Sequence, residues 1–292
     1  MKKTHLTTIS KSGTSGNKQQ TPNTKLQLYS PFQIACKYVR YLFTASNGKG
    51  HGVHSPYVFE WIEKALNGKE NGPIQTQIES QRKQLLANSK TIEVKDLGAG
   101  STSLSSTQRK ISAIAQSSLK SFKYASLLHR IADFHGAETI VELGTSLGLT
   151  TSYLASIPSN PSVYTFEGVP DIAKQAASVF EALSLRNITL IQGHFDETLP
   201  AFLKENHKLD LVYIDGNHRK EPTLNYFKQI LQNSHENTMM IFDDIHWSKE
   251  MEEAWDFIKA HESVTLSMDL FFIGIVMFRK DFKVKQHFVI RY

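Results

Sequence analysis

The 292-residue sequence contains a single cysteine, Cys36, and this scarcity excludes two kinds of scaffold. One thiol can build neither an internal disulfide framework nor a cysteine-rich zinc site. Such cysteine usage fits a reducing compartment, so we expect a cytoplasmic protein. Long apolar runs are also missing, because the longest, Leu270 to Phe278, is too short to cross a bilayer as a helix.

Acidic residues are absent from the first 50 positions, which hold eight of the 33 Lys and Arg residues. The remaining 25 basic residues accompany all 28 Asp and Glu residues, so the basic character of the chain belongs to its N-terminal part. Residues 1–28 also have few large apolar side chains and cannot bury enough surface to become ordered. We expect a disordered basic tail over 1–28, with no clear nucleic-acid or membrane partner.

An N-terminal helical cap is predicted for residues 29–119. Apolar residues recur at helical spacing over 31–45, and the polar face of this helix is basic, so it either packs on the body or lies on a membrane surface. Further helices are expected at 56–67, 75–88, 104–117 and 120–135. His51 and His54 are predicted to lie in a turn, although both could also reach a site from the cap. The glycine-rich segment Asp96–Ser101 follows no convincing apolar strand and does not indicate a second nucleotide-binding unit.

From residue 138 onward, short apolar runs alternate with helical segments. Strands are predicted at 139–142, 162–167, 187–191, 209–214 and 237–242. The helices between and after them are predicted at 147–157, 170–183, 197–206, 219–233 and 248–260. Two apolar runs at 263–268 and 271–279 then leave no room for a helix and indicate an antiparallel hairpin. We therefore expect an α/β fold over 120–292, with a doubly wound, mostly parallel, seven-stranded Rossmann-like sheet that ends in this hairpin.

The most specific motif lies in residues 139–155. An apolar run ends in an acid, Glu142, and the following turn contains Gly144, Thr145, Ser146 and Gly148. Glycines let the backbone approach a ligand closely, and the start of the next helix offers free N–H groups. A nicotinamide site needs G-x-G-x-x-G, whereas Ser146 and Leu149 stand at the second and third glycine positions. The turn instead resembles the first motif of class I S-adenosylmethionine (SAM) methyltransferases, in which it wraps the methionine part of SAM.

Two further segments extend this resemblance. Glu167 ends the second strand, 25 residues after Glu142, where an acid can accept hydrogen bonds from both ribose hydroxyls. The resemblance places the loop after the third strand beside the adenine ring, where Phe195 either stacks or is simply a buried aromatic. The cofactor-binding residues predicted for SAM are Glu142, Gly144, Thr145, Ser146, Gly148, Glu167, Gly193, His194, Phe195 and Asp215.

Three acids follow the fourth and fifth strands, namely Asp215 and the pair Asp243 and Asp244. Carboxylates at the ends of neighbouring parallel strands meet at one crevice and repel one another unless a cation lies between them. Oxygen ligands suit Mg²⁺, Mn²⁺ or Ca²⁺. The pattern resembles metal-dependent O-methyltransferases of the catechol, caffeoyl-CoA and sugar types, in which these three positions bind the metal. Those of the catechol type carry a lysine where this chain has His218, which is a departure from the pattern.

The resemblance implies in-line methyl transfer from SAM to a small hydroxylated molecule, assisted by a divalent metal. The predicted catalytic residues are Asp215, with His218 or His246 as the proton acceptor. Alternatives are a metal-independent N- or C-methyltransferase, in which the acids bind SAM and cap helices, and a non-catalytic SAM-binding interaction protein. The N-terminal segment resembles uncharacterised bacterial methyltransferase-like proteins and specifies no acceptor. A homodimer is compatible with the resemblance, because related metal-dependent enzymes often form one.

Overall fold

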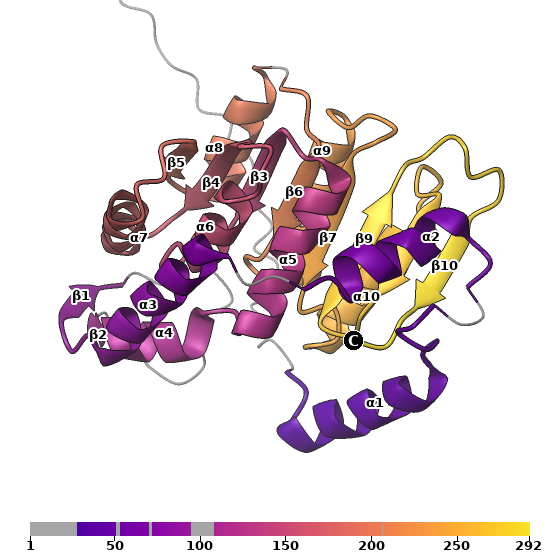
Figure 1. Ribbon diagram of the computed structural model, residues 1–292, viewed down its shortest axis with the longest axis horizontal. Helices are drawn as coiled ribbons and strands as arrows, with labels where there is room; N and C mark the ends of the chain where they lie inside the picture. Colours follow the sequence, from indigo (N-terminus) through magenta and orange to yellow (C-terminus); the bar gives the residue numbers. More distant parts are fainter. Residues whose placement is uncertain (1–27, 51–52, 70–71, 95–107, 206) are drawn as a thin grey trace, which may run out of the picture.

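The computed structural model describes residues 28–50, 53–69, 72–94, 108–205 and 207–292 (Figure 1). Almost all of the predicted tail, together with His51 and the glycine-rich segment Asp96–Ser101, lies outside the described residues. Within them, no helix is long and apolar enough to cross a membrane.

The core of the fold is a sheet of eight strands in the order β10-β8-β9-β7-β6-β3-β4-β5. The strands are β3 (Thr139–Leu143), β4 (Ser162–Glu167), β5 (Ile188–Gln192), β6 (Leu211–Ile214), β7 (Met239–Asp243), β8 (Leu266–Asp269), β9 (Ile273–Met277) and β10 (Gln286–Val289). Strand β9 runs antiparallel to both β7 and β8, and every other pairing is parallel. The predicted mostly parallel sheet and its terminal hairpin are confirmed.

The described sheet has one strand more than the seven predicted, and the additional strand is β10. It pairs with β8 at the edge of the sheet, and its residues are only partly buried or exposed. A short edge strand of this kind lacks the continuous apolar run that marks the buried strands, so its sequence pattern is weak.

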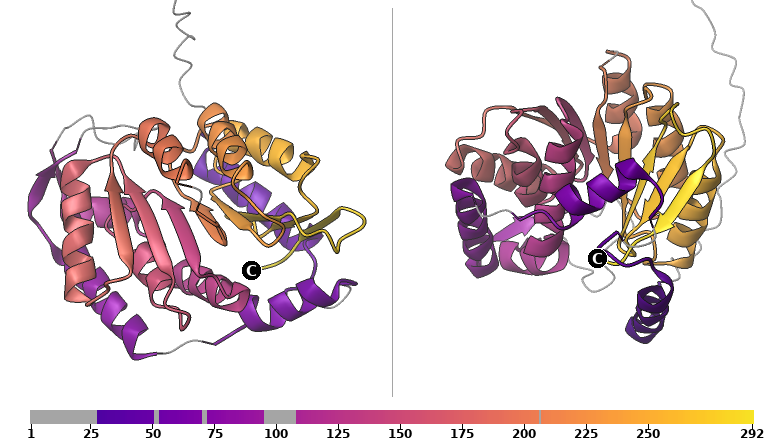
Figure 2. Two further views of the ribbon diagram at one scale, coloured as in Figure 1. Left: turned by 90° about the horizontal axis from the view of Figure 1, so that it is seen from above. Right: turned by 45° about the vertical axis from the view of Figure 1, so that its right-hand side comes forward.

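Helices cover both faces of the sheet (Figures 1 and 2). These helices are α2 (Pro56–Trp61), α5 (Phe122–His135), α6 (Leu149–Ala155), α8 (Phe195–Leu203), α9 (Lys220–Leu231) and α10 (Lys249–Ala260). Alternate residues of the central strands point to opposite faces: Ile140 and Tyr213 share a hydrophobic cluster with residues of α2, α5 and α6, whereas Val141 and Val212 share one with residues of α8, α9 and α10. Helix α7 (Pro170–Ala182) connects β4 to β5.

The predicted cap contributes α1 (Pro31–Thr44), α2, a π-helical turn at Ile62–Leu66, α3 (Pro73–Ala87) and α4 (Ile111–Ser118). Serine and proline start the first two helices, because Ser30 and Ser55 accept backbone N–H groups and a proline occupies each first turn. The helix predicted at 104–117 begins only at Ile111, since β2 (Gln108–Lys110) pairs with β1 (Thr91–Glu93) in a separate antiparallel hairpin.

Cap and body share hydrophobic clusters. Trp61 and Ile62 lie in one cluster with the sheet, and Ile78 and Ile114 lie in another with residues of α6 and α7. The division at residue 119 stays a prediction, because no separate core marks it in the described residues.

Helix α1 packs on the body through its aromatic side chains. The Tyr38 ring lies 5.0 Å from the Phe271 ring, and the Lys37 ammonium lies 3.0 Å from a Glu252 carboxylate oxygen. The opposite face of α1 leaves Phe32 and Phe43 exposed at 77% and 85%. Of the two roles predicted for this helix, packing on the body is observed, whereas contact with a membrane surface stays a prediction.

Candidate active site

The strand order reverses at the carboxyl ends of β3 and β6, and open α/β sheets have a crevice at such a reversal. From β3 the chain proceeds outward through β4 and β5 and then returns to the other side of β3 as β6. Gly144 has a φ of +108°, and a Cβ added there would lie 2.2 Å from the backbone oxygen of Asp215. Only glycine permits this approach of the two strand ends. Ligands of open α/β sheets bind at such reversals.

Hydrogen bonds hold the turn after β3 against the end of β4. The backbone N–H groups of Gly144 and Thr145 donate to the Phe166 carbonyl at 3.1 and 3.0 Å. Ser146, at φ +48°, donates its N–H to Glu167 Oε2 at 2.9 Å, and Val169 donates to Oε1 at 2.9 Å. Burial raises the pKa of Glu167 while these backbone donors oppose the rise. The turn is thus hydrogen-bonded directly to Glu167, the acid that is predicted to bind the ribose.

Glu142, another predicted cofactor residue, lies beneath the turn and is fully buried. Its Oε2 accepts hydrogen bonds from the hydroxyls of Thr151, in α6, and Thr165, in β4. Thr145 and Thr165 are also linked, with 2.6 Å between their hydroxyl oxygens. This geometry makes Glu142 a brace of the turn, and its predicted contact with the cofactor stays a prediction.

Burial raises the pKa of Glu142 from 4.5 to about 8, against the opposing hydrogen bonds of the two threonines. Between these pH values the unfolded chain releases a proton that the folded chain retains. The contribution of Glu142 to stability is therefore present below pH 4.5 and is lost as the pH rises to about 8. We expect E142Q to remove this part of the decline, as checked by urea unfolding of both proteins between pH 5 and 8. An equal pH slope in the two proteins would contradict the assignment.

The loop after β5 closes another side of the crevice. His194 caps α8, and its Nδ1 accepts the Asp196 N–H at 3.3 Å. Phe195 begins the helix and packs against the residue after Asp215, since a Cβ at Gly216 would lie 2.6 Å from the Phe195 ring. Gly193 takes a φ of +141°, which favours glycine at this position. The predicted adenine-binding residues therefore lie next to the Asp215 strand end.

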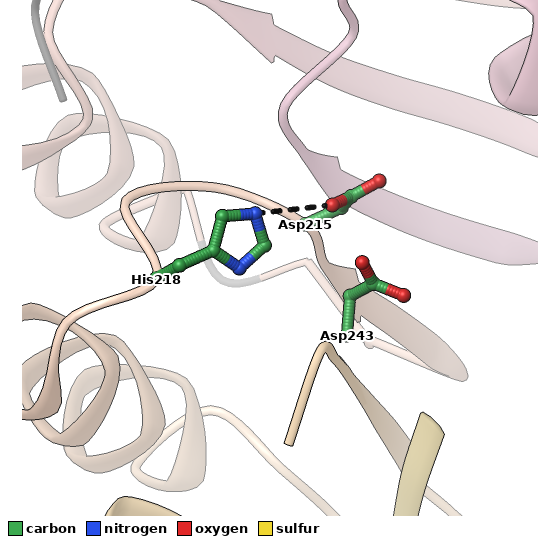
Figure 3. Close-up of side chains that lie close together, drawn as sticks. All are labelled: Asp215, His218 and Asp243. Atoms are coloured by element: carbon green, nitrogen blue, oxygen red, sulfur yellow. Dashed lines mark ion pairs between the residues drawn. The ribbon is translucent and has the colours of Figure 1, made fainter. Parts of the chain in front are cut away.

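Three predicted site residues come together at the ends of β6 and β7 (Figure 3). Ligand atoms of Asp215, His218 and Asp243 all lie within 4.8 Å of one another. His218 Nε2 lies 3.5 Å from Asp215 Oδ1, and its ring packs edge-on to Trp247. Asp244, the third predicted metal ligand, takes a φ of +53° and does not join this group.

A residue that the sequence analysis missed completes the cluster. The ammonium of Lys120, between α4 and α5, contacts Asp243 Oδ2 directly and lies 4.0 Å from Asp215 Oδ1. Arg82 of α3 donates to the Lys120 carbonyl at 2.6 Å and so holds the loop. A lysine between two helices is usually solvated, and nothing in its local sequence distinguishes Lys120.

The charges of the cluster are strongly coupled. Burial opposes ionisation of Asp215, but Lys120 and His218 outweigh it and lower the pKa of Asp215 to about 2. Burial and the charge of Asp215 raise the pKa of Asp243. Burial also opposes protonation of His218, yet the hydrogen bond and charge of Asp215 outweigh it and raise the His218 pKa. Asp215 is thus a stable anion that faces the Lys120 ammonium and the His218 imidazole.

His246, the second predicted proton acceptor, lies outside this cluster. Its Nδ1 pairs with Glu252 and its Nε2 with Asp269, both at 2.9 Å. Burial works against protonation, but the two carboxylates outweigh it and raise the pKa of His246 to about 9. Both ring nitrogens are thus engaged, which makes His246 an anchor between α10 and β8, and its predicted catalytic role stays a prediction. His54 is exposed.

Residues 141–245 match the family model described as "Methyltransferase domain". No curated protein matches the sequence. Among solved structures, an O-methyltransferase from Bacillus cereus in complex with SAH, the demethylated form of SAM, is 19% identical, with a TM-score of 0.52, over 76% of this chain and 97% of that one. A putative O-methyltransferase from Klebsiella pneumoniae is 16% identical, with a TM-score of 0.51, over 76% and 96%.

The SAH-bound Podospora anserina methyltransferase PaMTH1 is 11% identical, with a TM-score of 0.53, over 78% of this chain and 97% of that one. These likenesses concern the fold. They agree with the domain match, which spans the glycine turn of β3, the Glu167 loop and the strand ends that carry Asp215 and Asp243. Residues 141–245 thus match a methyltransferase domain, and the chain shares its fold with solved methyltransferases.

Proposed function

We propose that this methyltransferase transfers the methyl group of SAM to a hydroxyl oxygen of a small molecule at the crevice between β3, β6 and β7. The observation that carries the proposal is the pairing of His218 with Asp215, next to the Gly144 turn. Two of the similar structures are an O-methyltransferase from Bacillus cereus and a putative O-methyltransferase from Klebsiella pneumoniae. They support oxygen as the acceptor atom.

The residues around the crevice suit SAM. A carboxylate has about four lone-pair sites, and backbone N–H groups occupy two of those of Glu167, which leaves acceptors for the ribose hydroxyls. Gly144, at φ +108°, lets the turn lie against Asp215, and Gly148, at φ +81°, lets it pack against Phe180 of α7. The ring of Phe195 offers an aromatic surface for adenine, and Asp215 offers a negative charge for the amino group of the methionine part.

SAM supplies an electrophilic methyl group, so the chain has to align the acceptor and take its proton. His218 Nε2 faces Asp215, and we assign the acceptance of the hydroxyl proton to His218 Nδ1. Asp215 then stabilises the imidazolium and holds the ring in position, as a carboxylate does for other catalytic histidines. The oxygen lone pair forms the new bond to the methyl carbon while the bond from that carbon to sulfur breaks.

Metal assistance is the part of the sequence prediction that the geometry does not favour. The donor atoms are of a suitable kind, and Asp243 Oδ1 is buried without a hydrogen-bond partner in the described residues. However, the Lys120 ammonium already lies between Asp215 and Asp243. Near a protein surface, two like unit charges 4 Å apart repel by about 4 kcal/mol, and a divalent ion would double this. A metal therefore does not fit while Lys120 is in place.

Binding of SAH tests the cofactor site without knowledge of the acceptor. We expect E167A to weaken SAH binding by about 10- to 100-fold, because hydrogen bonds to a charged group contribute about 1.5–3 kcal/mol. Isothermal titration calorimetry on wild type and variant measures this change. The matched control is E181A, an exposed acid at the end of α7, which should bind SAH as wild type does. Equal affinity of E167A and wild type would refute the ribose assignment.

The acceptor class is tested by screening catechols, sugars and other hydroxyl compounds for SAH release from SAM, with amines as the comparison set. Transfer to hydroxyl compounds that is lost in H218A supports the proposal. Transfer only to amines or to carbon would favour the N- or C-methyltransferase alternative.

A further inference from the structure

We infer that Lys120 is the resident cation of this active site, so that its ammonium takes the place of a divalent metal and methyl transfer proceeds without one. The inference rests on the proposed function for its catalytic meaning, but its geometry is independent of any substrate. It also identifies a task for the N-terminal cap, which positions this lysine.

Lys120 places a positive charge between the carboxylates of two strand ends. Asp215 and Asp243 end adjacent parallel strands, and their carboxylates would repel if nothing positive lay between them. Lys120 Nζ contacts Asp243 Oδ2 and lies 4.0 Å from Asp215 Oδ1, and its side chain is only 19% exposed. One ammonium therefore supplies the bridging charge.

Contacts from the cap hold Lys120 in place. Arg82 of α3 donates to its carbonyl, and Glu79 in turn accepts from Arg82 Nε at 2.8 Å. Glu79 also accepts the Tyr153 hydroxyl at 2.9 Å, which ties α3 to α6 beside the glycine turn. On the neighbouring side, the Ser118 and Ser146 hydroxyl oxygens lie 2.8 Å apart. The loop before α5 is thus fixed over the crevice from both sides.

The chemical consequence follows from this charge balance. The Lys120 ammonium lies beside Asp215 and balances its negative charge, while the same carboxylate positions the His218 imidazole for the acceptor proton. An ammonium at this point also favours negative charge that develops on an acceptor oxygen, which is the electrostatic part of what a metal would do. It provides no coordination sites, so the acceptor need not carry two adjacent oxygens for chelation.

The experiment measures Mn²⁺ binding by the loss of the free-ion electron paramagnetic resonance signal. Wild type, K120M and K120M/D215N are compared, with K110M as a control that removes an exposed lysine at the start of α4. We expect no site in wild type or K110M, one saturable site in K120M and none in K120M/D215N. A stoichiometric Asp215-dependent site in wild type would overturn the inference, and so would a folded K120M that binds no Mn²⁺.

A second measurement keeps the test valid if K120M folds poorly. Without its ammonium, the acid pair is uncompensated, so K120M should show a lower Tm that rises again on addition of Mn²⁺. K120M/D243N, which removes both partners, should regain most of the lost Tm without metal. No recovery in either case would overturn the coupling between Lys120 and Asp243. SAH calorimetry on wild type separates these outcomes from failure of the proposed function. If wild type does not bind SAH, only the proposed function is contradicted.

Discussion

Replacement of Asp215 by asparagine is expected to slow methyl transfer by about 100-fold or more, the largest effect on turnover that we predict. Asparagine retains the shape of the side chain but removes the negative charge that faces both His218 and Lys120. His218 then loses the group that orients its ring and stabilises its protonated form. A general base of this kind contributes about 10²- to 10⁴-fold to a rate.

The measurement is the initial rate of SAH formation by D215N, with the best acceptor from the screen. E253Q serves as the control. Glu253 of α10 pairs with Lys220 of α9, and its side chain is 43% exposed, so its neutralisation should leave the rate unchanged. A D215N rate within about threefold of wild type would exclude Asp215 and, with it, the assignment of His218.

Replacement of Gly144 by alanine is expected to abolish SAH binding and to destabilise the fold by several kcal/mol. Alanine is strained at a φ of +108°, which costs about 1–3 kcal/mol. In addition, the new methyl group would lie 2.2 Å from the Asp215 carbonyl, so the turn and β6 must separate. Separation at this point moves the two elements that form the crevice.

Gly136 provides a matched control for this prediction. It ends α5 at a φ of +63°, and an added Cβ has no atom within 4 Å. We expect G136A to lose only the conformational term, about 1–2 kcal/mol, and to bind SAH normally. Urea unfolding and SAH calorimetry on both variants separate strain from steric displacement. Equal behaviour of G144A and G136A would show that the close approach to Asp215 is unimportant.

Much of the fold is predictable because local patterns agree with its layers. Apolar runs of strand length alternate with helical spacing from residue 138 onward, and the observed strands begin and end within about two residues of most predicted positions. The motif at Glu142 and the acids after two strands place the site at the carboxyl edge of the sheet. The edge strand β10 and the β1–β2 hairpin escaped prediction, because their stability comes from pairing with residues distant in the sequence.

By itself, the sequence determined the α/β class, the SAM-type glycine turn and the convergence of Asp215 and Asp243 on one crevice, because parallel strands bring their carboxyl ends to a common edge. Only the tertiary structure decided which groups share that crevice. It brings Lys120 from a loop between helices into contact with Asp243, and it binds His246 between two carboxylates. Charge pairing acts over a few ångströms in space and leaves no periodic trace along the chain. Tertiary packing therefore decided which cation lies in the site.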